Sequence, residues 1–541
     1  MRRTRRIWAI AILLTISLAC ALPAADKPAS SPASQGSKLI VAKDTTFVTG
    51  PLHADGTVNY LAAVNEMYGQ GATNENNAAV LLLRAYGPQA IVAEFRQRIL
   101  KELSLGDLPE QGQYLERFAS AMTPEQIAAL GYEPFEAATT RPGDAPFREE
   151  LLQWLKKNEK SLDLVVAASE RSRFFVPWVS NENPPTMWDG LVAFSYGSTR
   201  GGCRALAARA IVKAQEGNLD AAAQDLAAVH RLARLLAQGP TLLNQLSSLA
   251  CDFLACKAEQ GIALHVKMTP SQTQVFIRMI HSFSPWPLPT AVFDAGERLF
   301  TLDCSMLVVR GGLEGLVHHL ETTWSKYLPQ DRTKQAAPLP KFELDVNEYL
   351  RAINEDYDQI AQCAQGKSYP KRKAAFDAME KDVPSVLQAV YKETKEDVLS
   401  GRVARKRITL VIEKMGTGDR KGLSRMLGLL DLSELSSGVT RRSFAMADQE
   451  RMQQMLSLVA MALAACRADT GSWPASLDAL APKYLNEVPA DLFIEQPLKY
   501  QVQGARYVLY SVGPNMRDDG GVKEFSSSES DNKDDIAISS E

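Results

Sequence analysis

The chain has 541 residues, of which 45% are hydrophobic, 23% charged and 7% aromatic. At about 100 to 200 residues per domain, this length suffices for several domains. The hydrophobic and charged fractions exclude a mainly disordered chain and a polytopic membrane protein. Lysine and arginine number 60 and aspartate and glutamate 63, so the formal net charge of −3 does not favour nucleic acid as a partner.

Residues 1–25 have the layout of a secretory signal peptide. Arginines precede an apolar run from Ile7 to Leu18, and small residues follow it. The run is shorter than the roughly 20 residues of a membrane-spanning helix, so we expect cleavage, export and no remaining transmembrane segment. The destination is the periplasm, the outer envelope or the extracellular space. Ser17-Leu18-Ala19-Cys20 also resembles a bacterial lipobox, which leaves a lipid anchor at Cys20 as an alternative.

Residues 26–45 are rich in proline, serine and alanine near their start, and this composition predicts a flexible linker. Beyond it, the cysteines are widely spread and lack the spacing of a disulfide framework or a zinc motif. Cys251 and Cys256 lie five apart in an expected helix, so their side chains point about 140° apart. We predict that both are buried small hydrophobic residues.

Residues 46–444 are predicted to form an irregular array of α-helices, because apolar residues recur at three- and four-residue spacing and alternating β-branched runs are scarce. The clearest unit is a helical hairpin at 204–246. Its first helix ends at Gly217, and Asn218 starts a second helix that runs through Leu236. The hairpin resembles a tetratricopeptide repeat, but further copies at the 34-residue period are absent, so we do not expect a regular solenoid.

The helical body offers little catalytic chemistry. It contains no phosphate-binding glycine loop, no dinucleotide fingerprint and no helical zinc-hydrolase motif, so we predict no catalytic residues and no organic cofactor. The alternative is an extracytoplasmic hydrolase with dispersed carboxylates. On a helix, Asp294 and Arg298 would lie one turn apart and form a pair. The densest candidates are Asp294, Glu297, Arg298 and Asp303.

Residues 402–425 hold eight basic residues and two acidic ones. The segment lacks the interleaved aromatic side chains on which nucleic-acid bases stack, and export makes nucleic acid an unsuitable target. We therefore predict a solvated helix face and no nucleic-acid partner.

The C-terminal region changes pattern to a helix followed by short strands. A helix at 445–468 is expected to stop at Gly471, ahead of Pro474. A short helix at 476–480 follows, and then a hairpin with one strand at 498–500, a second at 507–510 and Gly504 in its turn. This order predicts a helix laid on a small sheet.

That order resembles the C-terminal half of the major pseudopilins of type II secretion systems. The matching positions form a series along the chain, namely Asp469-Thr470-Gly471-Ser472-Trp473-Pro474, Tyr484-Leu485, Val488-Pro489, Asp491, Pro497-Leu498, Tyr500 and Tyr510-Ser511. The resemblance implies a pseudopilin-like α+β module at 445–521, followed by an acidic, serine-rich tail at 522–541. The expected fold class is therefore mainly α, with a small C-terminal α+β domain.

The sequence also departs from that family. Pseudopilins carry the related helix at their amino terminus, where it assembles filaments, whereas here it lies far along the chain and contains Arg451 and Gln453. Filament assembly is therefore not expected. We predict an exported, non-catalytic binding or scaffold protein, whose partner is an envelope protein or another cell-surface component.

In the family, a C-terminal loop binds calcium, and the resemblance implies the same for this chain. Asn515 and Asp535 stand at matching positions, while Lys533 replaces an expected acid. Asp518 and Asp519 would supply further oxygens of the kind that calcium prefers, with Asp531 and Asp534 available to complete the shell. A disordered, solvating acidic tail accounts for the same residues, and both interpretations stay open. The predicted calcium ligands are Asn515, Asp518, Asp519 and Asp535.

Overall fold

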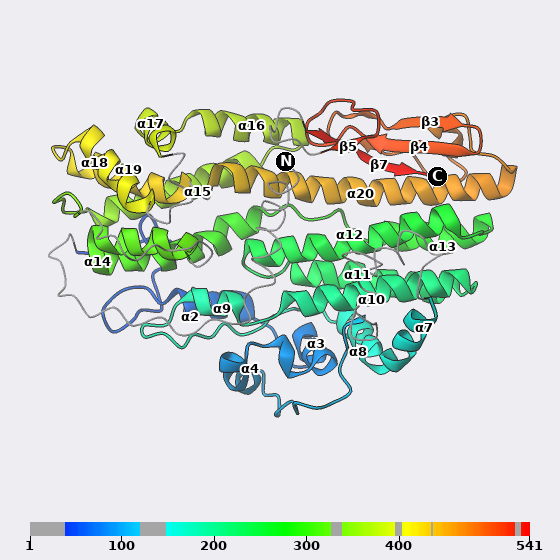
Figure 1. The fold of residues 1–541 in the computed structure, drawn as a ribbon, viewed down its shortest axis with the longest axis horizontal. Coiled ribbons are helices and arrows are strands. Elements are labelled where there is room, and N and C mark those ends of the chain that lie inside the picture. Colours follow the sequence, from blue (N-terminus) through cyan, green and yellow to red (C-terminus); the bar gives the residue numbers. More distant parts are fainter. Residues whose placement is uncertain are drawn as a thin grey trace.

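The computed structural model describes residues 38–118, 148–325, 338–394, 403–433, 436–524 and 532–540. These residues form a mainly helical molecule with a small set of antiparallel strands near the C-terminal end, as the sequence predicted. Figure 1 shows long helices lying side by side along the long axis of the molecule. The predicted signal peptide, Cys20 and most of the predicted linker lie outside the described residues.

We call the helices of residues 196–433 the trunk. Short helices near the start of the chain cover one side of it (Figure 1). Asn77 caps one of them by accepting a hydrogen bond from the backbone amide of Ala79, and Gly87 ends it with a φ of 78°. The helices of this part are α2 (Tyr60–Gly69), α3 (Ala78–Tyr86), α4 (Arg96–Glu102), α7 (Arg148–Lys157), α8 (Glu159–Ser169) and α9 (Met187–Val192).

The predicted helical hairpin is confirmed. Gly217 takes a φ of 83° in the turn, and the Asn218 side chain accepts from the amide of Ala221 to cap the second helix, which ends at Leu236. The apolar stripe of that helix is buried. Two more helices continue the layer, so that it comprises α10 (Tyr196–Gln215), α11 (Leu219–Leu236), α12 (Leu242–His265) and α13 (Pro270–His281).

The second half of the trunk forms its own apolar cluster beside the first. A π-helical turn at Val292–Glu297 leads into a long helix, which kinks at Gly312 with a φ of 56°. The helices of this half are α14 (Arg298–Ser325), α15 (Val346–Ala364), α16 (Tyr369–Lys381), α17 (Ser385–Glu393), α18 (Val403–Met415) and α19 (Arg420–Ser433).

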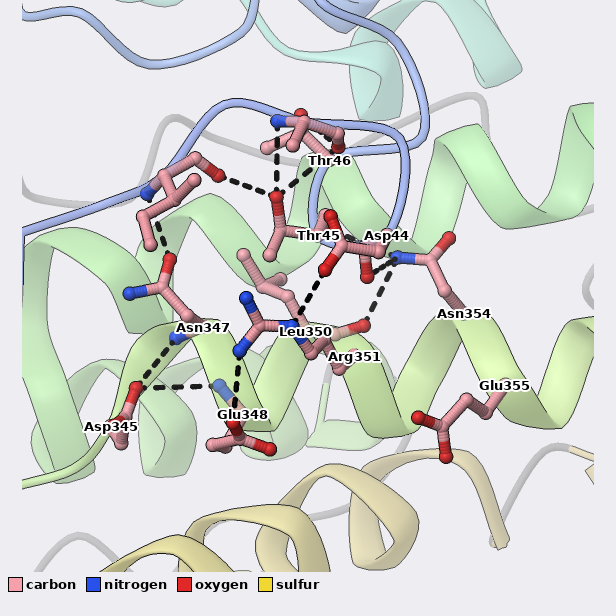
Figure 2. Close-up of polar contacts among 12 residues, drawn as sticks. Asp44, Thr45, Thr46, Asp345, Asn347, Glu348, Leu350, Arg351, Asn354 and Glu355 are labelled. Atoms are coloured by element: carbon pink, nitrogen blue, oxygen red, sulfur yellow. Dashed lines mark hydrogen bonds and ion pairs between the residues drawn. The ribbon is translucent and has the colours of Figure 1, made fainter.

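The first described residues lie against α15, as Figure 2 shows. The Ile40 amide donates to Asn347 Oδ1 at 2.8 Å, and Asn354 Nδ2 donates to the carbonyl of Thr45 at 2.8 Å. Arg351 pairs with Asp44 at 2.7 Å. Specific contacts with the trunk therefore begin within the range that was predicted to be a flexible linker, because its last residues carry hydrogen-bonding groups that α15 satisfies.

One helix, α20 (Ser436–Thr470), runs along the trunk for 35 residues. It packs against α12 and α13 of the first half and α16 of the second, and it also contacts the C-terminal strands. The helix predicted at 445–468 is thus part of a longer one, and its apolar residues share one core with α10–α13. The proposed module boundary at 445 falls inside a continuous, packed helix.

Among the described residues, the C-terminal strands form three small antiparallel sheets. The predicted hairpin is confirmed as β3 (Lys499–Gln503) and β4 (Arg506–Ser511), and β4 also pairs with β7 (Ile536–Ser539) in a three-stranded sheet. The remaining strands form two pairs, β1 (Ala490–Asp491) with β2 (Gln496–Pro497) and β5 (Lys523–Glu524) with β6 (Lys533–Asp534).

The described part of the predicted acidic, serine-rich tail at 522–541 forms the strands β5, β6 and β7. Ile536 and Ile538 alternate along β7 and are buried against the core, which gives the segment the pattern of a half-buried strand. Within the described ranges, none of the helices combines the length and the apolar character of a membrane span.

Candidate functional site

A group of polar side chains lies buried where α11, α12 and α20 meet. His230 comes from α11, and Glu450 comes from α20. Asp252, Cys256 and Glu259 come from α12, where their spacing of four and three residues places them on one face of the helix. All five are at most 4% exposed. We call these five residues the buried polar centre.

His230 is held between two carboxylates. Its Nδ1 lies 2.7 Å from Asp252 Oδ1, and its Nε2 lies 2.9 Å from Glu259 Oε1. Burial disfavours the charged ring, but the charges and hydrogen bonds of the two carboxylates outweigh it and raise the pKa of His230 to about 10. Without a metal ion, the imidazole is therefore protonated on both nitrogens at neutral pH and donates to both carboxylates.

Further side chains fix Asp252. Gln454 Nε2 donates to its Oδ2 at 2.6 Å, and Arg234 Nη1 donates to its Oδ1 at 3.2 Å. Burial acts to raise the pKa of Asp252, but His230 and Arg234 outweigh it and lower the pKa below its ordinary value. Asp252 is thus a firmly held, ionised partner of the histidine.

Glu450 and Cys256 complete the centre in their neutral forms. Burial and the neighbouring charge of Asp252 raise the pKa of Glu450 well above its ordinary value, so its protonated carboxyl donates to Asp252. Burial likewise raises the pKa of the Cys256 thiol, whose Sγ lies 3.4 Å from Glu450 Oε1. Two cations, His230 and Arg234, thus contact the carboxylate of Asp252.

The centre also carries a donor set for a metal ion. Among the described residues, ligand atoms of His230, Cys256 and Glu259 lie within 4.8 Å of one another, and so do those of Asp252, Cys256 and Glu450. Nitrogen, thiolate and carboxylate ligands of this kind are typical of zinc sites. The centre was not predicted from the sequence, although the spacing Asp252-x3-Cys256-x2-Glu259 on one helix face indicates such a cluster.

The structure brings three of the four predicted calcium ligands together. Asn515 Nδ2 donates to Asp519 Oδ2 at 2.8 Å. Asp535 Oδ2 accepts from the amides of Asp519 at 3.1 Å and of Gly521 at 2.7 Å. The 513–521 loop is thereby folded back onto the start of β7.

Asp518, the fourth predicted ligand, has different partners. Its Oδ1 accepts from the Tyr510 hydroxyl at 3.0 Å, and its Oδ2 lies 3.4 Å from Lys499 Nζ. Asp534 is closer to the other ligands, because its Oδ1 accepts from the Asn515 amide at 3.2 Å. Burial, followed by repulsion from neighbouring carboxylates, raises the pKa of Asp534 to about 6. Asp531 lies outside the described residues.

The carboxylates that we considered for an alternative hydrolase function each contact a different partner. Asp294 pairs with Arg298 at 3.1 Å, as their spacing predicted. Glu297 accepts from the Leu242 amide, and its burial raises its pKa to about 7. Asp303 Oδ2 accepts from the Met187 amide at 2.8 Å. These contacts cap and join helices, and they do not direct the carboxylates at one common point.

Several basic residues of segment 402–425 pair with acids from other helices. Lys414 contacts Glu393 of α17, and Arg405 contacts Glu314 of α14. Arg407 is buried, with its guanidinium over the Tyr391 ring. These side chains hold helices together, so the segment is more than the solvated face that we predicted.

No protein-family model, no curated protein and no solved structure matches this chain. The pseudopilin resemblance therefore rests on the C-terminal motifs alone.

Proposed function

We propose that the protein is exported and acts in the cell envelope as a non-catalytic binding or scaffold protein with a pseudopilin-like C-terminal module. The observation that carries this proposal is the position of α20. One side of the helix packs against α12 and α13, and it also contacts β4 and β7. The module is therefore joined to the trunk through a shared core.

Polar contacts reinforce this junction. Gln260 Nε2 of α12 donates to Gln453 Oε1 of α20 at 2.9 Å, and Ser457 Oγ donates to the carbonyl of Cys256 at 3.2 Å. In a pseudopilin, the related helix assembles the filament. Here the face that such assembly would need is already buried in the trunk, which supports a scaffold over a filament subunit.

We further propose that calcium binds the module through Asn515, Asp518, Asp519 and Asp535, with Asp534 beside them. Burial and mutual repulsion raise the pKa values of Asp534 and Asp535, so the loop concentrates negative charge that a cation would neutralise. Above the folded-state pKa of Asp534, about 6, the ionised carboxylates destabilise the metal-free protein.

Calcium titration of the mature chain tests this site. At pH 7 we expect saturable binding and a higher unfolding temperature with calcium, because the ion relieves the repulsion. Asp535→Ala should lose both effects, whereas Asp220→Ala, which removes a distant surface acid, should keep them. Absence of saturable binding to a folded wild-type chain would remove calcium from the proposal.

The proposed envelope function is tested with the mature chain, residues 26–541, as bait in a crosslinked envelope extract. We expect one recurrent partner, which then binds the purified chain saturably, and heat-unfolded bait should fail to capture it. Turnover of a substrate in a hydrolase panel would instead favour the enzyme alternative. Retention of the full-length chain in the cytosol would contradict export.

A further inference from the structure

The buried polar centre has the donor atoms and the supporting contacts of a metal site. Cys256 and Glu259 are one helical turn apart on α12, and His230 faces them from α11. In a tetrahedral zinc site, bond lengths of about 2.0 to 2.3 Å place donor atoms about 3.3 to 3.6 Å from one another. His230 Nε2 and Glu259 Oε1 are 2.9 Å apart, and the donor atoms of all three residues lie within 4.8 Å of one another. The donor spacing of a zinc site falls between these two distances.

We propose that His230, Cys256 and Glu259 bind a structural divalent metal ion of the zinc class, with Glu450 as the fourth ligand. Glu450 Oε1 lies 3.4 Å from Cys256 Sγ, in the second group of donors with Asp252, so its side chain would have to shift to reach an ion bound by His230 and Glu259. Four protein ligands make a closed site without an open coordination position, which is the arrangement of structural zinc. The ion would cross-link α11, α12 and α20 through their ligand side chains.

Asp252 supplies the outer contact that a ligating histidine needs. Metal-bound histidines usually donate their second ring N–H to a carboxylate, which fixes the ring and its tautomer. His230 Nδ1 meets Asp252 Oδ1 at 2.7 Å, and Gln454 holds the other oxygen of Asp252 at 2.6 Å. His230 Nε2 is thereby directed at Glu259 and is the nitrogen that would bind the ion.

A second, independent observation comes from Glu259. Its Oε2 is fully buried and has no hydrogen-bond partner among the described residues, and Glu259 is 0% exposed. A buried carboxylate oxygen without a partner is costly. Glu259 Oε1 already contacts His230 Nε2. A cation bound between these two side chains would therefore satisfy Glu259 Oε2.

Metal ions bind the deprotonated forms of histidine, cysteine and glutamate side chains. Binding of an ion to this centre should therefore displace protons into solution.

Cobalt titration of the chelator-treated mature chain is the direct test. We expect one Co²⁺ per chain, a thiolate-to-cobalt charge-transfer band in the near ultraviolet, release of protons on binding, and displacement by Zn²⁺. Cys256→Ala should abolish the band. Cys251→Ala is the matched control, because Cys251 is buried on the same helix but contacts Cys203, and it should keep the band.

Asp252→Asn tests the outer contact, and we expect it to weaken Co²⁺ binding by about 10- to 100-fold. A folded wild-type chain without saturable Co²⁺ or Zn²⁺ binding would overturn the proposal and leave the centre as an ion-pair network. A band that persists in Cys256→Ala would overturn the assigned ligands. If that variant does not fold, the wild-type spectrum and metal stoichiometry decide alone, and neither depends on the envelope partner.

Discussion

Arg372 and Asp448 form a buried ion pair that joins α16 to α20. Arg372 Nη2 lies 2.6 Å from Asp448 Oδ2, and the two side chains are 4% and 1% exposed. Arg372 also donates to the carbonyl of Gly366 at 2.8 Å. Removing one partner of such a pair leaves the other charge in the core without compensation.

We expect Arg372→Met to lower the free energy of unfolding by about 3 kcal/mol, because Asp448 would stay buried with only its longer ion pair to Arg451, at 3.4 Å. Urea denaturation followed by circular dichroism measures this loss. The double variant Arg372→Met/Asp448→Leu removes both charges and should recover most of it. Equal losses in the single and double variants would show that packing, and not the ion pair, is responsible.

The buried polar centre gives the metal-free protein a defined pH dependence. The folded-state pKa of His230, about 10, lies above the ordinary value of 6.5. The stability that the protonated ring provides is therefore fully present below about pH 6.5 and is lost as pH rises toward 10. We expect the free energy of unfolding of chelator-treated protein to fall across this window.

His230→Gln is the control for that measurement, since glutamine does not titrate. The fall between pH 6.5 and 10 should be smaller in this variant than in the wild type. A wild-type curve that is flat across the window, or one that the variant reproduces, would contradict a protonated His230. Metal affinity should change in the opposite direction and increase with pH, because protons compete for His230 and Cys256.

At the scale of elements, the crossing of α15 and α19 requires a glycine at the point of contact. Gly428 of α19 faces α15, and a Cβ built on it would lie 2.5 Å from the carbonyl oxygen of Tyr349. The two helices make extensive contact there. The crossing therefore leaves no room for a methyl group.

Gly428→Ala should destabilise the protein by about 1 to 3 kcal/mol, because the added methyl forces α15 and α19 apart. Gly418→Ala is the matched control, since a Cβ at Gly418 would meet no atom within 4 Å. Thermal unfolding of both variants compares them directly. An unchanged midpoint for Gly428→Ala would mean that the crossing can shift at little cost.

At the scale of the whole molecule, α20 connects two cores. Ala447 and later apolar residues of the helix belong to the first core, together with α10–α13 and the C-terminal strands. Phe444 belongs to the second core, together with α14 and α15. The trunk and the C-terminal strands therefore share one core, which continues across residue 445.

A chain that ends at residue 444 should lack cooperative unfolding of the first core, because the buried faces of α12 and α13 would be exposed to water. Residues 445–541 alone should likewise fail to fold. Differential scanning calorimetry of both fragments and of the mature chain checks this. A sharp transition in either fragment would re-establish a domain boundary near residue 445.

Local signals predicted much of this fold. Gly217 and Asn218 place the hairpin turn because glycine tolerates a positive φ and asparagine caps a helix. The buried polar centre was not predictable in the same way, because Asp252 and Glu450 are 198 residues apart along the sequence and meet only when α12 and α20 pack. In a helical pattern, an isolated polar residue is interpreted as solvent-exposed, and only tertiary contacts show otherwise.

The six cysteines of the described residues form no disulfide. Cys203, Cys251 and Cys256 are buried among α10–α13 and Cys466 of α20 is buried in the same core, whereas Cys304 of α14 and Cys363 of α15 are only partly covered. The four buried sulfurs become reactive toward an alkylating reagent only when the first core opens, whereas the two partly exposed ones can react without that opening. Labelling of individual cysteines, resolved by mass spectrometry, therefore times the opening of the first core, with Cys304 and Cys363 as internal references.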